Sequence, residues 1–352
     1  MLTTERLHLK LTAQAPTRID LAGATLDIHP LYLFQGGRFR EAGLTVNAAI
    51  DLTTQAVLEE SGERGIELRS LDLDRTLKVD SLEELDQLQG ADSLPLLANI
   101  VRFYRPRPGF RLTTRSNVPP GSGLGGSSSL LIAVSSLLVQ RENRPVSKRQ
   151  MIDWAADVEA RTLGIPTGKQ DYYPAAFGGL AALHFNIGRE RREALNPSPN
   201  FLRRLDQSLL LGYSGASRFS GANNWAMLKR GIDDRAEMEP LLQRIAETAS
   251  RMRQALLDED LPQAGECLAE EWENRRRLAE GVSTPQLEEI FAQAREAGAW
   301  GAKVCGAGGG GCFVVLCPPE RRALVGEAIC RDGVRLLDPG LRGHGVRVWL
   351  EA

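Results

Sequence analysis

Short runs rich in β-branched and apolar residues dominate the first third of the chain. Two of them, 45–52 and 65–71, are separated from their neighbours by turn-forming and charged residues. Runs of this length and composition are typical of strands. The segment up to about residue 115 is therefore predicted to begin as a β-sheet.

The next part of the chain has apolar residues at the spacing of amphipathic helices. Between Ser127 and Val139, apolar residues recur on one face of a helix, and a second amphipathic segment extends from Ser147 to Leu163. Serine directly before an apolar period is a favoured N-cap. We predict two helices that pack against the preceding sheet and complete one structural unit.

The second half of the chain contains both strand-like and helix-like patterns of apolar residues. The pattern predicts strands at Ser208–Tyr213 and Cys312–Leu316, long helical segments between about residues 223 and 280, and a helix over 284–297. Helices and strands alternate irregularly rather than as repeated βαβ units. The predicted fold class is therefore α+β.

A break in periodicity suggests how the chain divides. The stretch 187–200 is charged and then rich in proline and asparagine. Such segments are typical of domain boundaries. We expect an N-terminal domain over residues 1–190 and a C-terminal domain over 201–352, in keeping with the two domains that 352 residues favour.

Composition and charge exclude several function classes. The chain is 42% hydrophobic and 25% charged, with 43 basic against 45 acidic residues and a formal charge of −2. This balance does not favour binding to nucleic acid or to an anionic membrane. There is no run of about 18 apolar residues and no signal-peptide pattern at the start, so we expect a cytoplasmic protein.

Cysteine and histidine give no sign of a metal site or a disulfide framework. The five cysteines are odd in number, contain no C-x-x-C pair and mostly lie in apolar segments, which favours buried thiols. The four histidines are scattered without metal-ligating spacing. Zinc chemistry is therefore not expected.

The run 117–130, which we call the glycine loop, carries the clearest chemical signal. It reads Asn-Val-Pro-Pro-Gly-Ser-Gly-Leu-Gly-Gly-Ser-Ser-Ser-Leu and stands between an apparent strand, Phe110–Thr114, and an amphipathic helix. Glycines let backbone amides approach an anion, and a helix N-terminus adds unpaired N–H groups and a positive dipole end. The loop is predicted to bind phosphates, with a flexible turn as the alternative.

Two nucleotide-binding motifs compete for this spacing. The dinucleotide pattern G-x-G-x-x-G occurs at Gly121–Gly126 and again at Gly306–Gly311, so the pattern alone does not decide the ligand. The G-x-x-x-x-G-K-[ST] signature is absent from the loop, and so is the G-x-S-x-G of hydrolases. A bound triphosphate would need amides, serine hydroxyls and a metal ion.

Three segments stand in order along the chain: Ala15-Pro-Thr-Arg-Ile-Asp-Leu-Ala-Gly23, the core of the glycine loop, and Gly301-Ala-Lys-Val-Cys-Gly-Ala-Gly-Gly-Gly-Gly311. Together they resemble the three motifs of the GHMP kinases, the galactokinase, homoserine, mevalonate and phosphomevalonate kinase superfamily. Within the superfamily, the segments 168–179, 214–220 and 281–285 are most similar to the D-glycero-D-manno-heptose 7-phosphate kinase branch, with fucokinases as near relatives. The resemblance implies a ribosomal protein S5 domain 2-like N-terminal half, a ferredoxin-like C-terminal half, and ATP and substrate between them.

The resemblance also implies roles for single residues. The family's metal-coordinating serine falls at Ser127 and its acidic metal ligand at Glu159. Its catalytic carboxylate, acting as base or as electrostatic partner of the attacking hydroxyl, falls at Asp171, and the basic residue of the first motif at Arg18. The alternatives are a helix N-cap for Ser127, a solvated helix-face acid for Glu159, and ordinary loop or surface roles for the other two.

Binding residues follow in the same way. The resemblance implies ATP contacts at Pro120, Gly121, Ser122, Gly123, Leu124, Gly125, Gly126, Ser127, Ser128 and Ser129. It also suggests substrate contacts at Asp27, Lys169, Arg218, Gly308 and Gly309, where solvated charge and a tight strand turn are the alternatives. The sequence departs from heptose kinases at Gly23-Ala-Thr-Leu-Asp27, where they have Gly-Gly-Gly-Thr-Asp, and in a longer stretch, 34–44, that contains Arg38, Arg40 and Glu41.

Together these features predict an ATP- and Mg²⁺-dependent kinase that phosphorylates a hydroxyl of a sugar or sugar phosphate directly. A heptose 7-phosphate is the first candidate substrate. A non-catalytic sugar or nucleotide sensor on the same fold and a dinucleotide oxidoreductase are the alternatives. The expected partner is a small molecule, with no nucleic acid and no membrane, and the sequence favours no oligomeric state.

Overall fold

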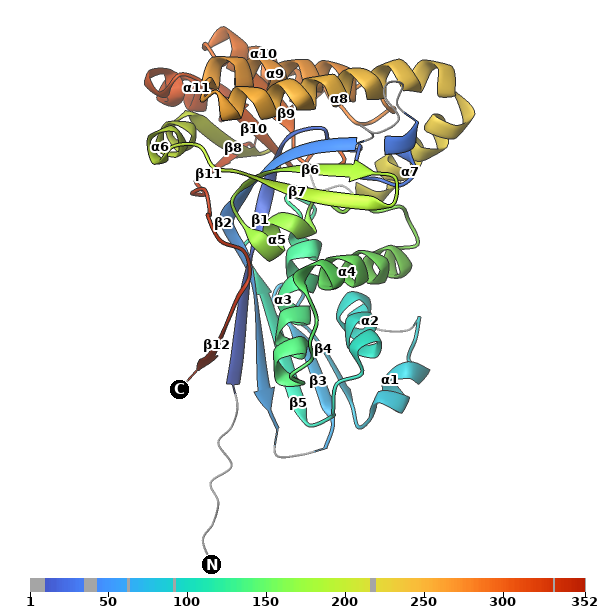
Figure 1. Ribbon diagram of the computed structural model, residues 1–352. Helices are drawn as coiled ribbons and strands as arrows, with labels where there is room; N and C mark the ends of the chain where they lie inside the picture. The colour runs from blue at the N-terminus through green and yellow to red at the C-terminus, as the bar shows by residue number, and fades with distance from the viewer. Residues whose placement is uncertain are drawn as a thin grey trace, which may run out of the picture.

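A computed structural model describes residues 10–34, 43–61, 64–90, 93–215, 220–331 and 333–351. Within these ranges the chain forms an eight-stranded sheet and a four-stranded sheet, each covered by helices (Figure 1). Among the strands of the described residues, β3 and β5 form the only parallel pair. The predicted α+β class is confirmed.

The large sheet is built around two long strands. β2 is 18 residues long and pairs with β1 along its length, with β6 over its first part and with β5 over its last part. The strand order is β12-β1-β2-β5-β3-β4, and β6 and β7 form a hairpin on β2. The strands of this sheet are β1 (Lys10–Ala22), β2 (Gly43–Glu60), β3 (Ile66–Ser70), β4 (Arg75–Val79), β5 (Phe110–Ser116), β6 (Leu180–Asn186), β7 (Arg189–Leu195) and β12 (Arg347–Glu351).

Helices of the N-terminal half pack on one face of the large sheet (Figure 1). The two predicted helices are confirmed as α3 and α4, and Ser147 caps α4 in a capping box with Gln150. Apolar residues such as Leu131, Val134 and Leu138 are fully buried between α3 and the sheet. The helices are α1 (Leu82–Gln87), α2 (Pro95–Tyr104), α3 (Gly126–Arg141), α4 (Lys148–Leu163) and α5 (Tyr172–Phe177), with a 3-10 turn, η1, at Leu31–Leu33.

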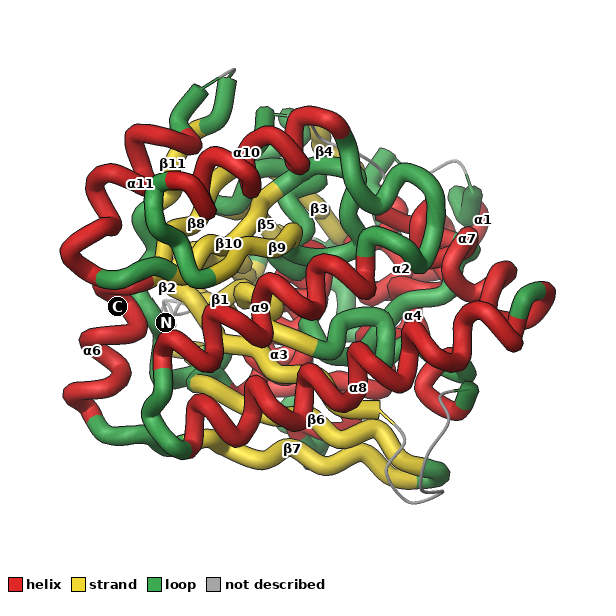
Figure 2. Tube along the Cα trace, turned by 90° about the horizontal axis from the view of Figure 1, so that it is seen from above, coloured by secondary structure: helices red, strands yellow, loops and turns green. Residues whose placement is uncertain are grey.

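The four-stranded sheet has the order β11-β8-β10-β9 and is antiparallel throughout. Helices α9, α10 and α11 pack on it, whereas α8 lies beside α9 and packs on β1 and β2 of the large sheet (Figure 2). Its strands are β8 (Leu209–Tyr213), β9 (Gly301–Val304), β10 (Cys312–Leu316) and β11 (Arg335–Leu337). The helices of this half are α6 (Pro199–Ser208), α7 (Ser220–Asp233), α8 (Arg235–Leu257), α9 (Leu261–Arg275), α10 (Pro285–Glu296) and α11 (Arg322–Ile329), with a 3-10 turn, η2, at Pro319–Arg321.

The stretch 187–200 contains regular structure. Its charged part forms β7, which among the described strands pairs with β6 alone, and Ser198 caps α6. Charged residues are tolerated there because Arg189 and Arg191 are exposed, while Glu190 and Glu193 form ion pairs with Lys169 and Arg253. The chain then passes to the second sheet, but β12 returns to pair with β1 in the first. The division at residues 190 and 201 stays a prediction.

The structure shows the state of the cysteines and the character of the helices. Cys267, Cys305, Cys312 and Cys317 are buried free thiols, as expected, whereas Cys330 is exposed. In the part of the chain that the structure describes, none of the helices combines the length and apolarity needed to cross a bilayer.

Candidate active site

A cavity of about 480 Å³ brings together segments that are far apart in the sequence. Its lining includes the glycine loop, Arg18 from β1, Glu159 from α4, Arg275 from the end of α9 and Gly306 after β9. The cavity therefore draws on both halves of the chain.

Three glycines of the glycine loop have left-handed backbone conformations. Gly121, Gly123 and Gly125 have φ values of 66°, 74° and 76°, which favour glycine. A Cβ at Gly123 would lie 2.5 Å from the carbonyl oxygen of Cys305, so a side chain there would force the backbone apart. Gly125 is the N-cap of α3, and none of the described side chains caps this helix start. Its first-turn N–H groups therefore suit an anion.

Most of the predicted nucleotide contacts line the cavity. Those that do are Pro120, Gly121, Ser122, Gly123, Gly125, Gly126 and Ser127. Leu124, Ser128 and Ser129 are buried behind them. Ser127 is the second residue of α3, beyond the N-cap, so its hydroxyl does not have the N-cap role that was the alternative.

Glu159 lies beside the start of α3 in a buried carboxyl site. Its Oε2 accepts hydrogen bonds from the Tyr172 hydroxyl and, at 3.4 Å, from Ser128 Oγ. Burial raises the pKa of Glu159, and hydrogen bonds from Ser127 and Tyr172 oppose that rise. Only 6% of Glu159 is exposed, so it is not the solvated helix-face acid of the alternative interpretation.

Ser127 and Glu159 fit a magnesium ion that arrives with phosphates. Among the described residues, no three His, Cys, Asp or Glu side chains are grouped so as to hold a metal ion by themselves. Mg²⁺ commonly takes only one or two protein oxygens and completes its shell with water and substrate phosphates. A hydroxyl and a carboxylate beside the glycine loop are a suitable donor set.

Arg18 and Asp171 form an ion pair at the edge of the cavity. Arg18 Nε donates to Asp171 Oδ1 at 2.8 Å, and Nη2 lies 2.6 Å from the same oxygen. Arg18 Nη1 also donates to the carbonyl of Gly123 at 2.5 Å. Burial raises the pKa of Asp171, and the Arg18 charge opposes this effect. The pair thus places a carboxylate directly against the glycine loop.

Asp27 lines the cavity as a second carboxyl group and is 5% exposed. Its Oδ2 accepts a hydrogen bond from the backbone N–H of Gln170 at 3.0 Å. Burial raises its pKa to about 6, although this hydrogen bond lowers it. Gly168 leaves the space that the carboxylate occupies, because a Cβ there would lie 1.9 Å from Oδ2.

The other predicted substrate residues lie away from the cavity lining or outside the described residues. Lys169 is absent from the cavity lining, and its Nζ contacts Asp153 Oδ1 at 2.8 Å and Glu190 Oε1 at 2.9 Å. Gly309 donates its backbone N–H to the carbonyl of Val282 at 2.7 Å, and Gly308 packs on the same residue. Arg218 falls outside the described residues, as do Arg38, Arg40 and Glu41.

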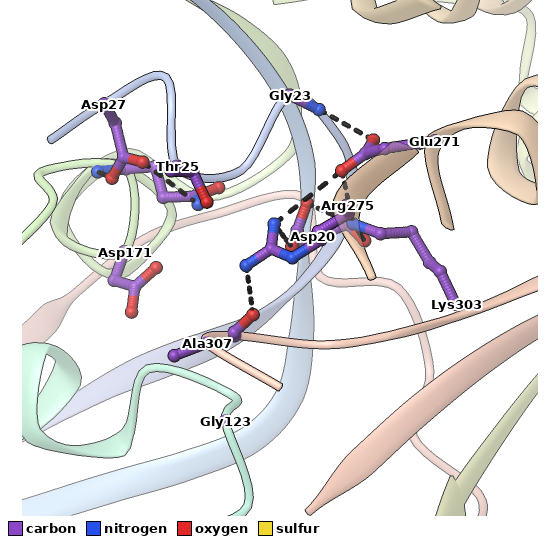
Figure 3. A network of polar contacts seen from close by, with 12 residues as sticks. Asp20, Gly23, Thr25, Asp27, Gly123, Asp171, Glu271, Arg275, Lys303 and Ala307 are labelled. Atoms are coloured by element: carbon purple, nitrogen blue, oxygen red, sulfur yellow. Dashed lines mark hydrogen bonds and ion pairs between the residues drawn. The ribbon is translucent and has the colours of Figure 1, made fainter. Parts of the chain in front are cut away.

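A group of buried charges beside the cavity is absent from the sequence-based prediction. We call Asp20, Glu271, Arg275 and Lys303 the buried charge cluster (Figure 3). All four residues are at most 2% exposed. Lys303 Nζ lies 2.7 Å from Asp20 Oδ1 and 3.1 Å from Glu271 Oε1. The only sequence signal is that Asp20 and Lys303 belong to the first and third motifs. In the sequence, Arg275 is the first of three consecutive arginines, Arg275–Arg277, and such a run would be interpreted as solvated charge.

Known protein families match both halves of the chain. The model described as GHMP kinases N terminal domain matches residues 95–179, and the model described as GHMP kinases C terminal matches residues 252–335. The first covers the glycine loop, Glu159 and Asp171, and the second covers the end of α9 and the third motif.

Individual relatives match almost the whole chain. A D-glycero-alpha-D-manno-heptose 7-phosphate kinase of Campylobacter jejuni is 29% identical over 345 residues, which are 96% of this chain and 98% of that protein. A bifunctional fucokinase/GDP-fucose pyrophosphorylase of Arabidopsis thaliana is 25% identical over 88% of this chain and 30% of its own length. The crystal structure of a D-glycero-D-manno-heptose 1-phosphate kinase from Bacteroides thetaiotaomicron is 25% identical, covers 96% of this chain and 98% of that chain, and superposes with a TM-score of 0.76.

Proposed function

This chain belongs to the GHMP kinases, and from that premise we propose that it transfers the γ-phosphate of ATP to a hydroxyl of a sugar or sugar phosphate. Heptose phosphates are the first candidates, because both a sequence relative and a structural neighbour are named as heptose phosphate kinases. Of these candidates we put D-glycero-D-manno-heptose 7-phosphate first.

One observation carries the proposal. A single cavity brings the Arg18–Asp171 ion pair and the oxygens of Ser127 and Glu159 together at the glycine loop. Phosphoryl transfer needs mainly positioning and neutralisation of phosphate charge, together with a group that orients the attacking hydroxyl. The cavity offers a candidate for each need.

The nucleotide side of the reaction falls to the glycine loop. Backbone N–H groups at the start of α3 would donate to the β- and γ-phosphates, since anions are favoured at a helix N-terminus. Ser127 and Glu159 would hold Mg²⁺. When bound, this ion would neutralise phosphate charge during transfer.

The acceptor side falls to two carboxyl groups. Asp171 would accept the proton of the attacking hydroxyl as the new bond to phosphorus forms, and Arg18 would keep Asp171 ionised against the effect of burial. Asp27 would accept hydrogen bonds from other hydroxyls of the sugar and so fix which one faces the phosphate. Lys169 and Arg218 stay predicted contacts for a phosphate on the substrate.

An ATP-consumption screen tests this proposal. Purified protein with Mg²⁺ is offered free hexoses, free heptoses and their phosphates, and ADP release is measured for each. We expect release with at least one carbohydrate, most strongly with a heptose phosphate. No release with any of them would contradict the sugar kinase assignment; sugar binding without ADP release would then favour a sensor, and NADH binding an oxidoreductase.

A further inference from the structure

The buried charge cluster joins three elements that the active site depends on. Asp20 is on β1, Glu271 and Arg275 are one turn apart on α9, and Lys303 is on β9 (Figure 3). Arg275 Nη1 lies 3.7 Å from both Asp20 Oδ2 and Glu271 Oε1. Two acids and two bases thus balance one another where water is excluded, and removing one partner leaves an uncompensated charge.

Glu271 reaches from the cluster to the backbone of the segment 23–27, which we call the acceptor turn because it ends at Asp27. Its Oε2 accepts a hydrogen bond from the N–H of Gly23 at 2.7 Å, and both groups are buried. Gly23 in turn accepts from the N–H of Leu26 at 3.0 Å, which closes the turn. The anchor at Gly23 therefore sets where Asp27 stands in the cavity.

Arg275 contacts the third motif, Gly301–Gly311, rather than the acceptor turn. Its Nη2 donates to the carbonyl of Gly306. Gly306 packs so closely on the glycine loop that a Cβ there would lie 2.8 Å from the Cα of Gly123. The loop is also tied to this motif by the N–H of Cys312, which donates to the carbonyl of Ser122 at 2.7 Å. Arg275 therefore supports the glycine loop from behind.

We propose that Glu271 and Arg275 are positioning residues with separate tasks: Glu271 holds the acceptor turn, and Arg275 holds the glycine loop. Asp20 and Lys303 complete the charge balance that keeps both side chains in place. Because α9 carries both residues, the helix fixes the spacing between the acceptor and the phosphate to be transferred. This inference rests on the proposed function, which assigns the acceptor to Asp27 and the nucleotide to the glycine loop.

Two variants separate the two tasks. In Glu271→Gln, one amide orientation sets the NH₂ group against the N–H of Gly23. The other orientation keeps only a neutral, weaker acceptor there and sets the NH₂ group against Lys303, so the anchor of the acceptor turn is lost or weakened. In Arg275→Lys, the charge stays but the hydrogen bond to Gly306 is lost, because lysine lacks the guanidinium fork. The matched control is Glu273→Gln, two residues along the same helix, where the carboxylate pairs with Arg276 at the surface.

The measurements are KM for D-glycero-D-manno-heptose 7-phosphate, or for the best acceptor of the screen, and Kd for Mg·AMP-PNP by calorimetry. We expect Glu271→Gln to raise the acceptor KM about tenfold with Kd changed less than about twofold, and Arg275→Lys to do the reverse. Glu273→Gln should change neither constant. A general structural role would move both constants together in both variants, and that result, or no change in either, would overturn the inference.

A charge-balanced variant covers the case in which Glu271→Gln does not fold. Glu271→Met/Lys303→Met removes one acid and one base, leaves Asp20 with Arg275, leaves no acceptor opposite the N–H of Gly23, and carries the same expectation as Glu271→Gln. Unaltered acceptor KM in this variant would overturn the assignment of Glu271. A wild-type protein that phosphorylates no sugar contradicts the proposed function and this inference together, whereas an active wild type without the crossed pattern contradicts only the inference.

Discussion

Arg18 and Asp171 are 153 residues apart in the sequence and meet through a hydrogen bond of 2.8 Å and an ion pair of 2.6 Å to one carboxylate oxygen. Arg18 is 2% exposed and is fixed a second time by the carbonyl of Gly123. The pair therefore connects β1, the glycine loop and the start of α5. A carboxylate in this position is oriented before any substrate enters.

Replacing the carboxylate of Asp171 tests its part in catalysis. We expect Asp171→Asn to lower kcat by about 10²- to 10⁴-fold, the usual contribution of a general base. The Kd for Mg·AMP-PNP should change less than about threefold, because the glycine loop is intact. Full turnover in a variant that still binds the nucleotide would remove Asp171 from the chemistry.

Tyr172 is expected to orient Glu159 for metal binding. Its buried hydroxyl donates to Glu159 Oε2, and losing such a partner typically costs about 10- to 100-fold in metal affinity or activity. Tyr172→Phe should raise the Mg²⁺ concentration for half-maximal activity by about tenfold, and weaken Mn²⁺ binding in the presence of AMP-PNP to match.

The neighbouring tyrosine provides the control for this prediction. Tyr173 donates its hydroxyl to Glu190 at 2.7 Å, away from Glu159, so Tyr173→Phe should leave the Mg²⁺ dependence unchanged. Equal effects of the two substitutions would show that loss of packing, rather than orientation of Glu159, is responsible.

Gly168 is expected to tolerate no side chain because Asp27 fills the adjacent space. In Gly168→Ala, the new Cβ would meet Asp27 Oδ2 at 1.9 Å, so the carboxylate must move and give up the N–H of Gln170. The acceptor KM should rise about tenfold or more, with the KM for ATP little changed. Gly343→Ala, where an added Cβ meets no atom within 4 Å, is the control, and equal KM values in the two variants would contradict the role of Asp27.

The raised pKa of Asp27 predicts a pH-dependent stability difference. The carboxyl has a pKa of about 6 in the folded chain and about 3.9 when unfolded, so the folded state holds more protons between these values. Stability from this group is present below about pH 4 and is lost as pH rises to 6. An asparagine side chain does not titrate, so Asp27→Asn should gain on the order of 3 kcal/mol relative to wild type across this window.

Urea unfolding at several pH values measures this gain. The difference in unfolding free energy between Asp27→Asn and the wild type should grow from pH 4 to 6 and then level off. A difference that does not depend on pH, or that shrinks over this window, would contradict the burial of an ionisable Asp27.

Local signals in the sequence predicted the regular elements well. The helix from Lys148 to Leu163 is an example, because the serine cap and the apolar period lie within the segment itself. Strand β7 was missed, since a sequence such as Arg-Glu-Arg-Arg-Glu has no apolar face to indicate a strand. It forms because β6 provides an edge to pair with.

The contacts within the candidate site were harder to predict from the sequence than the helices and strands. Residues within the three motifs could be assigned, whereas the partners of Lys303 could not: Asp20 is 283 residues away, and a buried charge looks like a surface charge in a sequence. The same difficulty affects Lys169. It stands two residues before Asp171, but Asp153 and Glu190 hold its ammonium group away from the cavity lining.

The proposed nucleotide site can be seen in a crystal structure of the protein with Mg·AMP-PNP. We expect the β- and γ-phosphates to lie on the N–H groups of the glycine loop, the ion to contact Ser127 and Glu159, and Asp171 to face the γ-phosphate. A glycine loop without phosphates at saturating nucleotide, or one that instead binds the pyrophosphate of NADH under the same conditions, would contradict it.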